Sequence, residues 1–431
     1  MLAFWTEAAA FLLRWLHVVA AIAWIGESFY FVALDRGLKP PKTGAQGLFG
    51  ESWSVHGGGF YLKQKFLPAP AELPAELHWS KWKSYTTWLS GFGLLALTYL
   101  LSPDLYLIDR NVADLSQTQA VVAAIVFLGA TWIVYDGLCK LVGFRDGLLG
   151  AFVAVMTLAL CDVATGVFSG RAAFLLVGAA LATIMSANVF FVIIPGQKRM
   201  VAALAKGEMP NPLDGSRGKQ RSVHNTYFTL PVVFAMLSTH YGTAYAHEYN
   251  WLVLAIAMAA AAMIRQFFVV WHSGERAWPL LGGGALVLFG LLFWLSPAMR
   301  PEAPVNPVPV ASNADGATMP DGSASPAIVL PDAWGEHPDT AAIQPIIEKH
   351  CVACHAAQPK LMASAPKGTM LDTPERIDTY AALVHKQAVE LKVMPPGNMT
   401  RMTDAERAAI GRWFVNRREG VSIQDAASPR E

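Results

Sequence analysis

Eight apolar runs restrict this chain to folds in which long helices satisfy their own backbone hydrogen bonds. An apolar run of about 20 residues can cross the hydrocarbon core of a bilayer as a helix. Charged residues make up only 15% of the chain, against about 25% in soluble domains. We therefore predict an all-α protein with an eight-span transmembrane helical bundle. The runs cover residues 15–34, 85–102, 119–138, 147–168, 172–194, 224–244, 250–271 and 279–296.

The distribution of Lys and Arg predicts the orientation of this bundle. The loops after spans one, three, five and seven hold sixteen of these residues, whereas the alternate loops hold only Arg110 and Arg171. By the positive-inside rule the first set of loops is cytoplasmic, so both termini face the opposite side. We expect a multi-pass membrane protein, with the lipid bilayer as a partner and both termini on the extracytoplasmic side. The net charge of +1 predicts no nucleic-acid partner.

The composition changes after the last apolar run and divides the chain into domains. We predict a membrane domain over residues 1–296 and a flexible linker rich in Pro, Ala and Ser over 297–340. Helical patterning returns over 341–420 and predicts a small domain, followed by a C-terminal tail over 421–431. The last helix of the small domain begins with Thr403-x-x-Glu406, a capping-box pattern.

The small domain carries the C-x-x-C-H pattern of covalent c-type haem attachment at Cys351, Cys354 and His355. The two thiols reach the haem vinyl groups, and the histidine ligates the iron. Met394, before a Pro-Pro pair, is the predicted second axial ligand, with Met399 and Met402 as competitors. A redox dithiol and half a zinc site are weaker interpretations, because the sequence has no second cysteine pair. We predict a small class I-like cytochrome c domain on a flexible tether.

Ionisable residues inside spans are costly and are candidates for function. A group of them lies toward the predicted cytoplasmic ends of the spans. A structural role is an alternative for each: Asp136 can pair with Lys140, and Arg265 with Glu27. As a set they suit a planar, amide-rich anion, with histidine as a general base. We predict His224, Glu27 and Asp136 as catalytic residues, and Asn188, Asn225, Arg265 and His56 as substrate-binding residues, with His56 on a closing loop.

Two histidines lie toward the opposite, outer ends of their spans. His17 and His240 are at matched depth in spans one and six, so they can clamp a b-type haem that relays electrons across the bilayer. Arg14 is placed to meet a haem propionate, and His247 is a reserve ligand. The alternatives are that both histidines are hydrogen-bonded bundle residues, or that the substrate itself binds on the outer side. In either case haem c is the only cofactor.

Four sequence blocks carry a resemblance to a known family. They are HGGGFY (56–61), WSKWKSYTTWLSG (79–91), SANVF (186–190) and HNTYFTLPVVFAMLSTHY (224–241). The chain resembles the bacterial membrane-bound urate oxidase (urate hydroxylase) family, in which an eight-span domain is fused to a cytochrome c. Together with the predicted orientation, the resemblance implies a bacterial inner-membrane protein with its N-terminus and cytochrome domain on the periplasmic side. The resemblance implies oxidation of urate to 5-hydroxyisourate, with water as the oxygen source and electrons passing to the haem. A respiratory acceptor, either a soluble cytochrome c or a terminal oxidase, would reoxidise that haem.

Two other functions are compatible with the same sequence features. A quinol–cytochrome c oxidoreductase would share the acceptor and replace urate with a lipid-soluble donor. A transporter with a fused sensor cytochrome would show inverted repeats and broken helices, and neither is clear in the sequence. The Arg, Asn and Gln residues of the cytoplasmic group favour a water-soluble anion such as urate over both.

Overall fold

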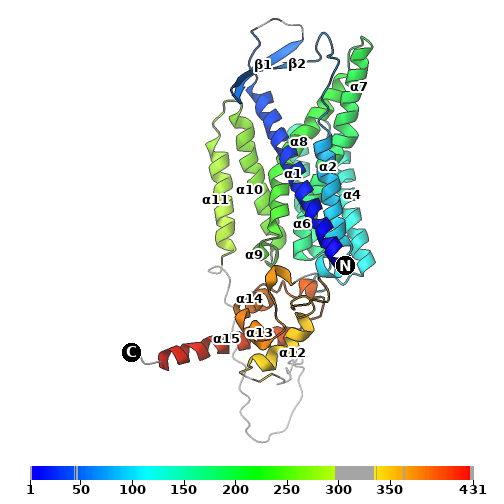
Figure 1. The fold of residues 1–431 in the computed structure, drawn as a ribbon. Coiled ribbons are helices and arrows are strands. Elements are labelled where there is room, and N and C mark those ends of the chain that lie inside the picture. The colour runs from blue at the N-terminus through cyan, green and yellow to red at the C-terminus, as the bar shows by residue number, and fades with distance from the viewer. Residues whose placement is uncertain are drawn as a thin grey trace, which may run out of the picture. The chain divides into compact units, whose positions relative to one another are not determined.

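The computed structural model describes residues 2–42, 44, 47–296, 334–335, 337–362 and 365–427. They divide into two compact units, built mainly from residues 1–291 and from 292–395 with 400–431. Helices dominate both units (Figure 1). The predicted linker over 297–340 lies almost wholly outside the described residues, so the boundaries on either side of it stay predictions.

The first unit has a helix at each of the eight predicted spans. These are α1 (Leu2–Gly37), α2 (Trp82–Leu95), α4 (Gln117–Val142), α5 (Asp146–Val167), α6 (Gly170–Ala187), α8 (Pro212–Ser238), α10 (Asn250–Trp271) and α11 (Trp278–Trp294). Short helices α3 (Pro103–Tyr106) and α9 (Gly242–Tyr245) lie in connections. The helical character of this unit is therefore as predicted.

Five helices of the described chain are long and apolar enough to cross a bilayer. They are Phe4–Gly37, Gln117–Val142, Asp146–Val167, Gly170–Ala205 and Asn250–Trp271. The other three differ for separate reasons. Helix α11 has only 17 residues. Helix α2 has 14 residues and is continued by a π-helical turn, η1 (Ala96–Leu100). Helix α8 begins with a polar stretch. A membrane protein is thus supported, and the count of eight spans stays a prediction.

Helix α6 forms the centre of the bundle. Most of its residues are buried, and α4, α5 and α8 pack around it. A Cβ added at Gly178 would lie 2.6 Å from the Cβ of Ala235, so α6 and α8 approach closely at small residues. Helix α1 instead packs mainly on α2 and exposes large apolar residues along its length, as expected for a lipid-facing surface.

A π-helical turn, η2 (Asn188–Ile193), joins α6 to α7 (Ile194–Ala205) without a break in the helix. Such turns widen a helix locally and are frequent at functional sites. Asn188, the first residue of η2, is fully buried. The turn therefore marks the part of the bundle where polar side chains meet.

A β-hairpin corrects the prediction of an all-α fold. Strands β1 (Leu48–His56) and β2 (Gly59–Phe66) pair in antiparallel register, with Val55 opposite Phe60. The two-residue turn places Gly57 at φ 58° and Gly58 at φ 80°. A type I′ turn needs positive φ at both positions, which glycine adopts without strain. The segment predicted as a closing loop around His56 is thus the end of a defined hairpin.

The second unit is a small helical domain with its own core. Its elements are α12 (Thr340–His350), η4 (Pro366–Gly368), α13 (Pro374–Thr379), α14 (Ala381–His385), η5 (Lys386–Glu390) and α15 (Asp404–Ala427). The short helix η6 (Pro396–Asn398) lies between η5 and α15 in the chain. Ile343, Ile347 and Trp413 lie in the core, together with Cys351 and Met402. The predicted capping box forms: the Thr403 amide donates to Glu406 Oε2 (2.7 Å), and the Glu406 amide donates to Thr403 Oγ1 (3.2 Å).

We predict that Glu406 makes this domain sensitive to acid. Burial alone would raise the pKa of Glu406, but hydrogen bonds from Thr403, Lys349 and His350 outweigh it and lower the pKa to about 2. A carboxyl group with a lowered pKa stabilises the fold above its ordinary value of 4.5 and loses that effect as the pH falls toward 2. Glu406→Gln should cost about 1–3 kcal/mol at pH 7 and flatten the loss of stability below pH 5. Calorimetry of the full chain at several pH values measures both effects, and an unchanged pH profile in the variant would contradict this assignment.

Candidate functional site

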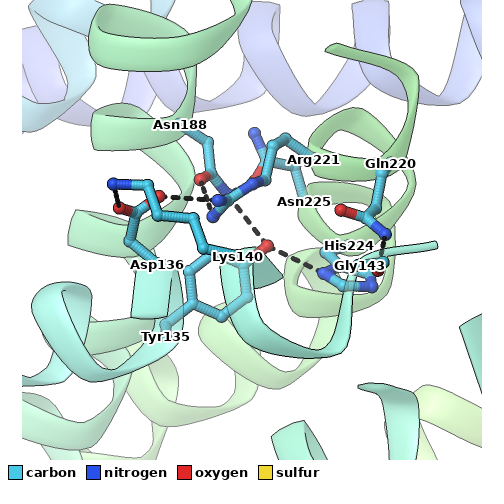
Figure 2. A network of polar contacts seen from close by, with 9 residues as sticks. All are labelled: Tyr135, Asp136, Lys140, Gly143, Asn188, Gln220, Arg221, His224 and Asn225. Atoms are coloured by element: carbon cyan, nitrogen blue, oxygen red, sulfur yellow. Dashed lines mark hydrogen bonds and ion pairs between the residues drawn. The ribbon is translucent and has the colours of Figure 1, made fainter. Parts of the chain in front are cut away.

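A buried guanidinium organises the polar residues of the bundle. Arg221 on α8 is 4% exposed. Its Nη2 donates to Asp136 Oδ1 of α4 (2.6 Å), and its Nη1 donates to Asn188 Oδ1 of η2 (3.2 Å). The guanidinium also lies over the Tyr135 ring, 4.9 Å from its centroid. Asp136 also pairs with Lys140 (2.7 Å), so the predicted Asp136–Lys140 pair forms. The Asp136 carboxylate thus binds two cations, Lys140 and Arg221 (Figure 2).

The chemistry of Arg221 sets the direction of the other hydrogen bonds. Because arginine can only donate, Asn188 accepts with Oδ1 and donates with Nδ2 to the Tyr135 hydroxyl (3.2 Å) and to Asn225 Oδ1 (3.0 Å). The Tyr135 hydroxyl, which accepts from Asn188, also forms a hydrogen bond with His224 Nδ1 (2.7 Å). When Tyr135 donates in this bond, the neutral His224 ring carries its proton at Nε2. Figure 2 shows this chain of contacts from Arg221 to His224.

The network holds its members in place and does not conduct protons along its length. Arg221 and Asn188 separate Asp136 from Tyr135, and neither guanidinium nor amide passes a proton on readily. Tyr135 and Asn188 are fully buried, whereas His224 is partly exposed. Only the Tyr135–His224 pair combines a movable proton with a base.

A cavity of about 600 Å³ opens beside the network, between α4, η2, α7 and α8. Four cations and two carboxylates line it: Lys140, Arg199, Arg217 and Arg221 against Asp136 and Asp214. Three hydrogen bonds from Arg199 (3.2, 3.1 and 2.5 Å) lower the pKa of Asp214, which therefore stays charged at neutral pH. Trp132 and Phe191 supply an aromatic wall, with ring centroids 4.9 Å apart. The two rings are tilted by 36°, so a planar ligand can stack on one of them, and the excess of two positive charges suits an anion.

Two predicted site residues belong to neither the network nor the cavity lining. Glu27 on α1 binds Lys83 (2.7 Å) and accepts a hydrogen bond from Ser80, so the alternative pairing of Glu27 with Arg265 is not formed. Arg265 on α10 is 3% exposed, and its Cζ lies 3.8 Å from the Phe29 ring centroid. Its Nε and Nη2 have no hydrogen-bond partner among the described residues.

The structure places His56 and the histidine pair away from this group. His56 is exposed at the end of the hairpin. His17 hydrogen-bonds through Nδ1 with the Thr87 carbonyl (2.9 Å), and its ring packs against Gly91 of α2. His240 is exposed just after α8. Within the described chain no hydrogen bond or ring contact joins His17 to His240, which agrees with the interpretation of His17 as a hydrogen-bonded bundle residue.

The geometry of the second unit suits covalent haem attachment. The amides of Cys354 (3.1 Å) and His355 (2.9 Å) donate to the Cys351 carbonyl, so the motif forms a tight turn. His355 Nδ1 lies 3.0 Å from the Thr369 carbonyl. A carbonyl only accepts, so Nδ1 carries the proton and Nε2 is left to bind iron. Burial raises the pKa of Cys351 to about 12, whereas reactive dithiols need a lowered pKa.

The three methionine candidates differ in burial, and Met399, like Met394, is partly exposed. Met394 is partly exposed, and its carbonyl accepts a hydrogen bond from Arg407 (2.8 Å). Met402 is 3% exposed and shares the core with Cys351. Met394 stays the predicted ligand.

Comparison with known families gives an independent result. The model of the urate oxidase N-terminal family matches residues 3–296. The chain belongs to this family. Because the match covers the whole first unit and its polar site, an oxidoreductase that acts on urate is supported. No curated protein and no solved structure matches the chain.

Several residues of the site escaped the sequence argument. Arg221 counted only as a loop charge, although it precedes Asn225 by four residues and so shares its helix face. Tyr135 and Trp132 look like interfacial aromatic residues in sequence, and Arg217 looks like another loop cation. A search for polar residues at helical spacing around the HNTY block would have found Arg221.

We predict that Asp136 stabilises the bundle by pairing with Arg221. Asp136→Asn leaves a buried cation without its carboxylate, which should cost about 3–5 kcal/mol. Lys140→Met removes the other partner, whose side chain is 75% exposed, and should cost at most about 1 kcal/mol. Thermal unfolding in detergent compares the two variants. Equal losses of stability would show that Asp136 acts through Lys140 and not through Arg221.

Proposed function

We propose that this chain oxidises urate to 5-hydroxyisourate at the bacterial inner membrane, with water as the oxygen source and haem c as the electron acceptor. One observation carries the proposal: a urate oxidase family match over residues 3–296 is joined, in a single chain, to a domain with a C-x-x-C-H motif. The oriented imidazole of His355 supports haem binding in that domain.

The reaction balances with water and a one-electron acceptor. Urate and one water give 5-hydroxyisourate, two protons and two electrons. A new C–O bond forms at C5 of urate, and its oxygen comes from the water. The protein must therefore hold an anion, admit water beside it and accept protons.

The described residues divide these tasks. Arg221, held by Asp136 and Asn188, presents positive charge to the substrate. We assign His224 as the base: in the tautomer that accepts at Nδ1 it can take a proton through the Tyr135 hydroxyl. Both oxygens of Asp136 bind cations, so we now assign Asp136 to positioning. Glu27 is occupied by Lys83 and Ser80, and we assign it to the contact between α1 and α2.

In the second unit the thiols of Cys351 and Cys354 would hold haem c, with His355 Nε2 and Met394 as axial ligands. Haem c, when bound, accepts electrons singly and returns them to a respiratory partner, either a soluble cytochrome c or a terminal oxidase. A b-type haem at His17 and His240 is a weaker proposal, because His17 packs on α2; we route no step through it. Acid–acetone extraction tests it, since b haem is removed and c haem stays attached.

Urate should reduce the haem without oxygen. Under anaerobic conditions half an equivalent of urate per haem should bring the absorbance spectrum to the fully reduced form, because each urate gives two electrons. A quinol analogue serves as the control for the competing function. Reduction by the quinol analogue but not by urate would overturn the proposal.

Met394→Ala should remove the methionine–iron charge-transfer band near the red end of the spectrum and lower the haem potential, because methionine ligation raises that potential. Met402→Ala is the matched variant. We expect it to keep the band and to lower the stability of the domain, since Met402 is a core residue. The reverse pattern would identify Met402 as the ligand.

A further inference from the structure

We infer that the cavity beside Arg221 is the urate-binding site, and that Trp132 and Arg217 hold the substrate together with Arg221. The inference rests on the proposed function and adds the position of the site and two binding residues. Three observations carry it: an unpartnered buried donor, an unpaired cation one helical turn from Arg221, and a cavity of suitable size.

The unpartnered donor is the indole N–H of Trp132. It is buried, and within the described chain it has no hydrogen-bond partner. A buried donor left unpaired is unfavourable, and tryptophan N–H groups usually find an acceptor. Trp132 lines the cavity beside Phe191. A planar ligand with carbonyl oxygens can accept from the indole and stack on the aromatic wall.

The unpaired cation is Arg217. It precedes Arg221 by four residues on α8, so the two guanidinium groups lie on one helix face. Among the cations that line the cavity, Arg199 is held by Asp214, and Lys140 by Asp136. Arg217 is exposed and makes no direct ion pair or hydrogen bond in the described part of the chain, although its charge helps Arg199 to lower the pKa of Asp214. Two arginines one turn apart can bind the carbonyl oxygens of a monoanion with planar forks of donors.

The cavity also has room for the second reactant. At about 600 Å³ it lies within the range of about 300–1,000 Å³ found for small-molecule sites. Urate is smaller than a drug-sized ligand, so space remains beside it for water. A reaction that takes its oxygen from water needs that space.

Arg265 is the rival anion site, because it is buried and has two unpartnered nitrogen atoms. Its guanidinium lies against the Phe29 ring, which already compensates part of the charge. Arg217 and Trp132 line the cavity, whereas Arg265 does not. Arg265→Gln therefore belongs in the experiment as the competing variant.

The test uses the full-length haem-loaded protein and measures urate turnover with ferricyanide as the final oxidant. Trp132→Phe keeps the ring and removes the N–H, and Arg217→Gln removes the cation. We expect each to raise KM for urate about tenfold and to change kcat less than twofold. Lys219→Gln is the matched control, because it removes an exposed cation from the same helix outside the cavity, and it should leave KM unchanged.

Equilibrium dialysis with radiolabelled urate measures binding separately from electron transfer. Weakened binding in Trp132→Phe and Arg217→Gln, with an unchanged haem spectrum and melting temperature, supports the site. Unchanged binding in both variants, or a loss only in Arg265→Gln, overturns it. If the wild-type protein binds urate but the haem stays oxidised, the proposed function fails while the binding result still decides the position of the site.

Discussion

The ion pair between Arg221 and Asp136 is the interaction on which the site depends. A cation inside an apolar bundle is tolerated only when a carboxylate and further hydrogen bonds replace its water. Here the carboxylate comes from α4, the amide from η2 and the cation from α8. The pair therefore sets how these three elements meet, and the cavity opens where they do.

The directed hydrogen bonds extend this constraint to the proposed base. Arg221 only donates, so it fixes the orientation of the Asn188 amide, which then donates to the Tyr135 hydroxyl. The same hydroxyl bonds His224 Nδ1. A residue that never exchanges a proton thus orients the hydrogen bonds that lead to the proposed base.

The helices were predictable from the sequence, because apolar segments leave the backbone no other partners. The hairpin was missed because its residues lie in a polar loop between spans. Its signal was present in the alternation of Trp53 and Val55 with serines, followed by adjacent glycines. Depth along the spans correctly grouped His224, Asn225, Asn188 and Asp136. Depth does not give rotation about a helix axis, so Glu27 and Arg265, at similar depth, meet other partners.

The cations of the cavity also bear on the predicted topology. Lys140, Arg199, Arg217 and Arg221 are among the sixteen residues that predict the cytoplasmic side. If these four cations serve to bind the substrate, their position gives no independent support for the predicted membrane orientation. Removing these four from sixteen leaves twelve residues against two in the alternate loops, which is still a strong bias. The predicted orientation therefore does not rest on the site, and by that prediction the cavity lies toward the cytoplasmic side.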